Sequence, residues 1–250
     1  MDTGLNGKVV LVVGGASGIG EACVRAFVSE GSTVVVADID DTRGHEASER
    51  AGAASFVHVD MVEPDGIEAM VAHAVSEYGG LDAAVNSAGT NGRQGTMTAD
   101  YDLDDWRHVI DVNLTGTFLS VRAEVRAMLA RGAGSIVNIA SGAGLVGTPG
   151  EPAYVASKHG VVGLSKAAAL EYARKGIRVN AVCPGPTRTP MIEAFLEANP
   201  KREQQILFGQ PIGRLGNPDE VAAAVVWLCS DPASFVVGHP FAVDGGAVTW

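Results

Sequence analysis

The chain has 250 residues, of which 46% are hydrophobic and 19% are charged, and its formal net charge is −11. This length suits one large α/β domain with a substantial core, and the composition excludes a disordered chain. The acidic balance argues against a nucleic acid or an anionic membrane as a partner, because both bind basic surfaces.

Cysteine and histidine placement narrows the class of protein further. Cys23, Cys183 and Cys229 lie far apart among apolar neighbours, which predicts reduced, buried thiols of a cytoplasmic protein. The six histidines form no H-x-H, H-E-x-x-H or Cys/His cluster, so we expect no metal site. No apolar run approaches the roughly 18 residues of a membrane span, and the first residues do not resemble a signal peptide.

Short apolar runs alternate with helical patterns along the whole chain. The runs are bounded by Gly, Asp or Asn, and several are rich in Val and Ile, as buried parallel strands are. They predict strands over 8–13, 33–37, 55–59, 82–85, 135–139, 178–182 and 240–243. The helical spacing predicts helices over 20–30, 41–51, 64–78, 103–131, 152–175 and 218–228. This alternation predicts an α/β fold with a single doubly wound (Rossmann) parallel sheet of about seven strands, helices on both faces and one domain over 1–250.

The stretch 186–211 differs from the other connections. It is long and polar, and it contains a helical pattern over 191–197. Segments of this kind are often lids over active sites, which predicts a substrate lid here. A surface insertion is the alternative.

A glycine-rich turn follows the first predicted strand. Gly14, Gly18 and Gly20 have the spacing G-x-x-x-G-x-G at the start of the first predicted helix. Glycines let the backbone approach a pyrophosphate, and the N–H groups and positive dipole end of the helix attract it. The alternative is a tight strand–helix connection that binds nothing.

Asp38 ends the second predicted strand, eighteen residues after Gly20. A carboxylate there accepts hydrogen bonds from the adenosine ribose and repels a 2′-phosphate. No Arg or Lys occurs within 14–20 or beside Asp38, and we interpret Arg43 as an exposed helix residue. The pattern predicts NAD rather than NADP. Asp38 could instead cap a helix, a role that Asp40 or Asp41 could also fill.

Tyr154 and Lys158 lie four residues apart in a predicted helix. This spacing places them on one face, one turn apart. The ammonium can therefore lower the phenol pKa from about 10, which makes Tyr154 a candidate proton donor or acceptor near neutral pH.

Together these motifs closely resemble the short-chain dehydrogenase/reductase family over essentially the whole chain. Further matches are the N-S-A-G of 86–89, the P-G-P-T-R-T of 184–189 and the D-G-G of 244–246, while Val13, Ser87 and Thr187 depart from the usual pattern. The resemblance implies catalytic roles for Asn113, Ser141, Tyr154 and Lys158. It implies cofactor contacts from Gly14, Ser17, Gly18, Ile19, Gly20, Asp38, Asp60, Met61, Asn86, Ala88, Gly89, Tyr154, Lys158, Pro184, Gly185, Thr187 and Thr189.

The same resemblance implies an NAD-dependent oxidoreductase that interconverts a secondary alcohol and a ketone. Tyr154 would act as acid and base, Ser141 would orient the substrate oxygen, Lys158 would bind the nicotinamide ribose, and Asn113 would position a water. For Asn113, bridging the backbone of a kinked helix is the alternative, and for Ser141, capping a turn. Two other functions stay open: a 3-oxoacyl-carrier-protein reductase, which Asp38 disfavours, and a dinucleotide-sensing binding protein, which the complete catalytic set disfavours.

Substrate and assembly are less specified. Pocket residues are expected from 90–101, 142–153 and 186–211, with apolar walls from Leu145, Val146, Met191, Ile192 and Phe195. Glu151 could bind a polyol hydroxyl or face water, and the expected substrate class is a secondary alcohol or ketone, with cyclic compounds and sugars among the candidates. The helix carrying Tyr154 is rich in small residues, which permits close packing within one subunit or between subunits; the resemblance implies a homotetramer.

Overall fold

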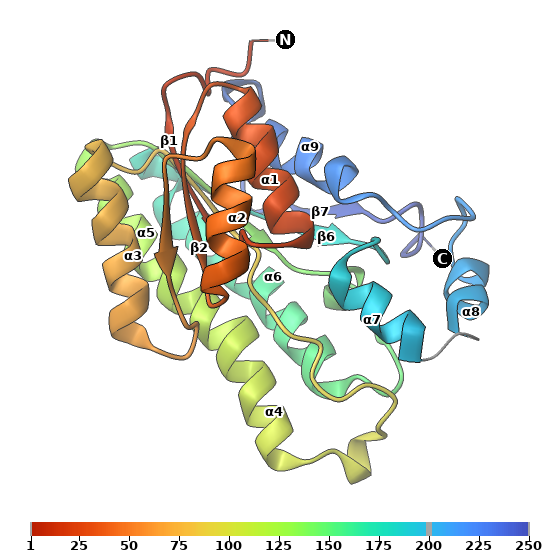
Figure 1. Ribbon diagram of the computed structural model, residues 1–250. Helices are drawn as coiled ribbons and strands as arrows, with labels where there is room; N and C mark the ends of the chain where they lie inside the picture. Colours follow the sequence, from red (N-terminus) through yellow and green to blue (C-terminus); the bar gives the residue numbers. More distant parts are fainter. Residues whose placement is uncertain (1, 199–201, 250) are drawn as a thin grey trace.

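Seven parallel strands form one sheet in the computed structural model, which describes residues 2–198 and 202–249 (Figure 1). The strands are β1 (Val9–Val13), β2 (Thr33–Asp38), β3 (Ser55–His58), β4 (Ala83–Asn86), β5 (Gly134–Ile139), β6 (Ile177–Pro184) and β7 (Pro240–Val243). Their order is β3-β2-β1-β4-β5-β6-β7, and every neighbouring pair is parallel. The predicted fold class is confirmed, and each predicted strand lies within two residues of an observed one.

Helices cover both faces of this sheet. They are α1 (Gly18–Ser29), α2 (Asp41–Ala51), α3 (Pro64–Tyr78), α4 (Leu103–Ile110), α5 (Gly116–Arg131), α6 (Pro152–Tyr172), α7 (Pro190–Ala198), α8 (Arg202–Phe208) and α9 (Pro218–Cys229). Short 3₁₀ turns occupy Thr98–Asp100, Gly142–Gly144, Ala173–Lys175 and Asp231–Ala233. Helices α3, α5 and α6 pack on one face, and α1, α2 and α9 pack on the other.

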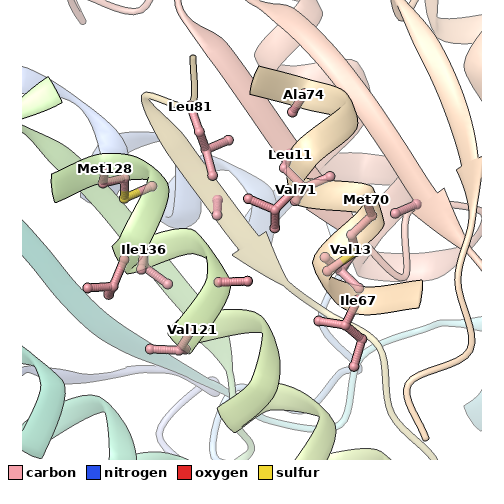
Figure 2. Packing of buried hydrophobic residues seen from close by; sticks show 14 of the residues in the cluster. Leu11, Val13, Ile67, Met70, Val71, Ala74, Leu81, Val121, Met128 and Ile136 are labelled. Atoms are coloured by element: carbon pink, nitrogen blue, oxygen red, sulfur yellow. The ribbon is translucent and has the colours of Figure 1, made fainter. Parts of the chain in front are cut away.

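Successive side chains of a buried strand point to opposite faces of the sheet, so each strand contributes to the hydrophobic core on both faces. Leu11 and Val13 of β1 belong to the cluster under α3 and α5, whereas Val10 and Val12 belong to the cluster under α1 and α9. Figure 2 shows the first cluster, where Met70 and Met128 lie on neighbouring helices above the sheet. Fully burying one such side chain stabilises the fold by about 1.5–3 kcal/mol.

The strand order reverses between β1 and β4. Strands β2 and β3 follow β1 on one side of it in the sheet, and strands β4 to β7 lie in order on its other side. The loops after β1 and β4 therefore leave the sheet in opposite directions and open a crevice at the carboxyl ends of the strands. This is where the sequence motifs converge.

Two helices differ from their prediction. The helix expected over 103–131 is interrupted by a π-helical turn at Asp111–Thr115, between α4 and α5. The hydroxyl of Thr117 donates to the backbone carbonyl of Asn113 at 2.7 Å, which satisfies a group that the widened turn frees. Helix α8 was not predicted, because its seven residues are too short to show a clear period.

A buried polar network joins β4, β5, α5 and α6. The side-chain amide of Asn86 donates to Glu124 Oε2 at 3.0 Å and to Asn138 Oδ1 at 2.9 Å, and the amide of Asn138 donates to Ser165 Oγ at 2.9 Å. Glu124 is fully buried in the core, and this burial raises the pKa of its carboxyl to about 8. Glu124 therefore holds a proton at neutral pH.

We expect Glu124→Gln to become progressively more stable than the wild type as the pH rises from 4.5 to 8. The folded protein binds a proton at Glu124 that the unfolded chain releases in this window, so the wild type loses stability there. The difference in unfolding free energy, measured with urea, should grow by about 1 kcal/mol or more between pH 5 and 8. Glu77→Gln, on an exposed part of α3, serves as control; a gap for Glu124→Gln that does not change with pH contradicts the prediction.

Candidate active site

A cleft of about 950 Å³ lies at the carboxyl ends of the strands. The loops after β1 through β6 line it, together with residues of α6, α7 and α8. Most of the predicted cofactor and catalytic residues line this one cleft, and the exceptions are Gly20, Asn86 and Asn113. Its volume is large enough for a dinucleotide and a small substrate together.

The glycine loop is shaped by close backbone approaches. Gly14 has a φ of +75°, and a Cβ there would lie 2.5 Å from the backbone nitrogen of Ala88 in the loop after β4. A Cβ on Gly20 would collide with the carbonyl oxygen of Gly14, so Gly20 packs α1 against the loop and does not line the cleft. Ser17 precedes α1 without capping it through its side chain, which leaves the first N–H groups of the helix for an anion.

Asp38 is held in place by two backbone N–H groups. Its Oδ2 accepts from Ala16 at 3.0 Å, and its Oδ1 accepts from Asp40 at 3.1 Å. The side chain of Asp40 accepts from the N–H of Arg43 and caps α2. The helix cap is thus Asp40, and the carboxylate of Asp38 lines the cleft beside the glycine loop.

The remaining predicted cofactor residues divide into two groups. Asp60, Met61, Ala88 and Gly89 line the cleft after β3 and β4, and Pro184, Gly185, Thr187 and Thr189 line it after β6. Asn86 does not line it, because its side chain points into the core and donates to Glu124 and Asn138. The side chain of Thr187 is also occupied, since its hydroxyl donates to the Gly185 carbonyl at 2.9 Å.

Tyr154 and Ser141 meet in the cleft. Ser141 follows β5, and its Oγ accepts from the N–H of Ala143 at 3.1 Å, so it also caps a 3₁₀ turn. Burial raises the pKa of the Tyr154 phenol above its ordinary value, a hydrogen bond with Ser141 lowers it, and the nearby charge of Glu151 raises it. The predicted lowering of the Tyr154 pKa by Lys158 is wrong for the protein without a bound cofactor. Burial raises this pKa by more than the hydrogen bond with Ser141 lowers it.

Lys158 lies beneath Tyr154 and is only 4% exposed. Its Nζ donates to the backbone carbonyl of Ile139 at 2.9 Å and lies 5.7 Å from the centroid of the Tyr154 ring. Burial lowers the pKa of the Lys158 ammonium to about 8. The side chain therefore carries a proton that it can release near neutral pH.

Asn113 is fully buried on the π-helical turn. Its Oδ1 accepts from the N–H of Thr90 at 2.8 Å, and its Nδ2 donates to the Thr90 carbonyl at 2.8 Å and to Ser157 Oγ at 3.1 Å. Its side chain thus ties the loop after β4 to the π turn and to α6, and does not bridge the backbone of its own helix. A Cβ added to Gly89 would lie 3.2 Å from Asn113 Oδ1 and 3.4 Å from Lys158 Nζ, so these two groups face the same glycine.

The charged side chains that line the cleft are mostly acidic. Among the lining residues, Lys158 is the single Lys or Arg, while Asp38, Asp60 and Glu151 supply three carboxylates, of which Asp38 accepts from the glycine loop. The described ranges 2–198 and 202–249 contain no cluster of His, Cys, Asp and Glu that could hold a metal ion. Within the same ranges, no helix is long and apolar enough to cross a membrane.

The far end of the cleft holds the candidate substrate pocket. Val146, Met191 and Ile192 line it as predicted, whereas Leu145 does not line it and packs against a small core cluster instead. Gln94 and Glu151 lie in the ranges expected to contribute. The side chain of Phe195 and residues 199–201 fall outside the described part of the structure. Sequence reasoning missed His108 and Val112, which reach the cleft from α4 and from the π turn. No sequence motif around these two residues indicates a contribution to the site, because the π turn itself could not be predicted from the sequence.

Comparisons with known proteins find relatives over almost the whole chain. A family model described as enoyl-(acyl carrier protein) reductase matches residues 14–248. The 2,5-dichloro-2,5-cyclohexadiene-1,4-diol dehydrogenase of Sphingobium indicum is 44% identical over 244 residues, 97% of each chain. The cyclohexanol dehydrogenase of an Acinetobacter species is 45% identical over 249 residues, 98% of this chain and 96% of that one. A crystal structure of an actinorhodin polyketide ketoreductase variant with NADPH has a TM-score of 0.93 and 38% identity, with 98% of each chain covered.

Proposed function

The chain belongs to the short-chain dehydrogenase/reductase family of oxidoreductases, and from this premise we propose that it oxidises a secondary alcohol on a ring to a ketone with NAD. One observation carries the proposal: Tyr154, Ser141 and Lys158 gather in the same cleft as the glycine loop and Asp38. The ring-alcohol class is supported by the names of two relatives, which act on a cyclohexadiene diol and on cyclohexanol.

In this proposal, Tyr154 is the acid and base. The substrate hydroxyl would hydrogen-bond to Ser141 and give its proton to the Tyr154 phenolate as the carbonyl forms. The oxidised nicotinamide ring supplies the hydride acceptor and a positive charge when it is bound. Ser141 is positioned for this task because its own cap hydrogen bond fixes its rotamer.

Lys158 and Asn113 complete the proposed proton relay. Lys158 would bind the nicotinamide ribose and pass the proton onward, which its lowered pKa of about 8 favours. Both amide hydrogens of Asn113 are engaged, but Oδ1 accepts one hydrogen bond, from Thr90, and retains a second lone pair. A water held there would lead from Lys158 towards solvent.

We propose NAD rather than NADP as the cofactor. The fixed carboxylate of Asp38 can accept from both ribose hydroxyls, and a 2′-phosphate there would meet Asp38 and Asp60. The nearest cation in sequence, Arg43, lies 3.6 Å from Asp40 and is paired with it.

A biosynthetic reductase is the second candidate function. The description of the matching family model and the NADPH in the polyketide ketoreductase structure favour it. The acidic environment of the predicted ribose site counts against it. A dinucleotide-sensing protein without turnover is disfavoured by the complete Asn113, Ser141, Tyr154 and Lys158 set.

We also propose one domain over 1–250 in which 186–211 acts as a lid. The single sheet runs from β1 to β7, which supports one domain, and Met191, Ile192 and Ile206 of the segment line the cleft, which supports a lid.

For the assembly we propose a homotetramer, supported by exposed apolar side chains on α5 and α6, Phe118 at 46% and Leu170 at 84%. Three free cysteines, all buried, support a cytoplasmic location.

Tyr154→Phe tests the proposed base. We expect kcat for oxidation of a ring alcohol to fall by about 10²–10⁴-fold, because the phenol oxygen is lost, while NAD binding measured by calorimetry stays within a few-fold. Tyr172→Phe is the matched control: Tyr172 lies on the same helix and also has a lysine, Lys175, over its ring, but it does not line the cleft. Turnover of Tyr154→Phe at the wild-type rate contradicts the assignment.

Asp38→Asn tests the cofactor preference. The wild type should have a kcat/KM at least about 100-fold higher with NAD than with NADP, and removing the charge should narrow that ratio about tenfold. Asp41→Asn removes an exposed carboxylate three residues away that does not line the cleft, and should leave the ratio unchanged. A wild type that works faster with NADP would overturn the interpretation of Asp38.

Sedimentation tests the assembly. At micromolar concentration we expect one species with four times the chain mass of 25.7 kDa, because the exposed apolar side chains of α5 and α6 lose contact with water only in an assembly. A monomer under these conditions would refute the tetramer.

A further inference from the structure

Glu151 presents a carboxylate to the substrate end of the cleft. It is the N-cap residue immediately before α6, three positions before Tyr154, and its side chain makes no capping hydrogen bond to that helix. Instead, Gln94 from the loop after β4 donates its Nε2 to Glu151 Oε1 at 3.2 Å, and both side chains line the cleft. The carboxylate is thus directed into the cleft and away from its own helix.

Among the described residues, no Lys or Arg forms an ion pair with Glu151. Val146 and Met191 line the same cleft, and Lys158, the single Lys or Arg of the lining, donates to the Ile139 carbonyl. A partly buried carboxylate that lacks a cation costs free energy unless donors satisfy its oxygens. Among the described residues, Gln94 is the one side chain that donates to the Glu151 carboxylate, so Oε2 of Glu151 remains able to accept a hydrogen bond.

Tyr154 and Glu151 are within electrostatic reach of each other. Glu151 is the N-cap residue of α6 and Tyr154 is the third residue of that helix, so both side chains leave the chain at the same end of α6. The charge of Glu151 also acts on the ionisation of the Tyr154 phenol. A molecule whose reacting hydroxyl lies on Tyr154 and Ser141 can therefore extend to Glu151 without leaving the cleft.

Resting on the proposed function, we propose that Glu151 and Gln94 form a subsite for a second hydroxyl group, so that the substrate is a ring diol. The second hydroxyl donates to Glu151, and the amide oxygen of Gln94 offers a further acceptor. A substrate carboxylate at this position would be repelled by Glu151. An unsubstituted ring would desolvate the carboxylate and return no hydrogen bond, which makes the subsite selective.

The test compares cyclohexane-1,4-diol with cyclohexanol as substrates in the presence of NAD. The measured quantity is kcat/KM for the diol divided by kcat/KM for cyclohexanol. It is determined for the wild type, Glu151→Gln, Glu151→Leu and Gln94→Leu. Loss of a hydrogen bond to a charged group corresponds to about a 10- to 100-fold change, so we expect the ratio to fall by this factor in Glu151→Leu, mainly through KM for the diol. Glu151→Gln and Gln94→Leu should lower it in the same direction by smaller factors.

Glu77→Gln, an exposed carboxylate on α3, is the control and should keep the wild-type ratio. Circular dichroism establishes that each variant is folded. A ratio that stays within twofold of the wild type in both Glu151 variants, while both ring alcohols are oxidised, overturns the subsite and leaves the proposed function intact. No oxidation of either alcohol by the wild type overturns the proposed function and, with it, the subsite.

Discussion

The pairing of β1 with β4 is the constraint on which the rest of the structure depends. A parallel sheet buried on both faces must send its connections over one face or the other, and the reversal of strand order beside β1 leaves a crevice at the carboxyl ends of the strands. The approach of Gly14 to Ala88 exists because these two strands are neighbours. The glycine loop, Asp38 and the loop carrying Gly89 therefore reach one cleft as a consequence of topology.

The same junction also explains the polar interior. Asn86 ends β4, and its amide links Glu124 on α5 to Asn138 on β5 directly below the cleft. A carboxyl placed there is tolerated because it is kept protonated and hydrogen-bonded. Asn113 acts in a similar way from the π turn, where its amide holds both backbone groups of Thr90. Two side-chain amides thus hold this region: Asn86 anchors the end of β4 to the core, and Asn113 anchors Thr90 in the loop that follows.

Much of the fold could be predicted because its signals are local. Strand–helix alternation, the turn at Gly14 and the spacing of Tyr154 and Lys158 depend on neighbours in sequence, and the seven-stranded sheet agrees with them. The π turn, the inward direction of Asn86 and the contribution of His108 depend on packing between distant segments. A residue's identity indicates what it can bond, but whether Asn86 faces the core or the cleft is decided by Glu124, thirty-eight residues away.

The Tyr154 pKa shows how such long-range effects change a chemical argument. Spacing alone suggests that Lys158 favours the phenolate, yet burial of the ring acts in the opposite direction and Glu151 adds to it. Lys158 is itself buried, so its own proton is held less tightly than in water. The protein groups therefore keep the phenol neutral and the base strong once it forms. Positive charge brought into the cleft would favour ionisation, so in the proposed mechanism the reactive state of Tyr154 is coupled to occupancy of the dinucleotide site.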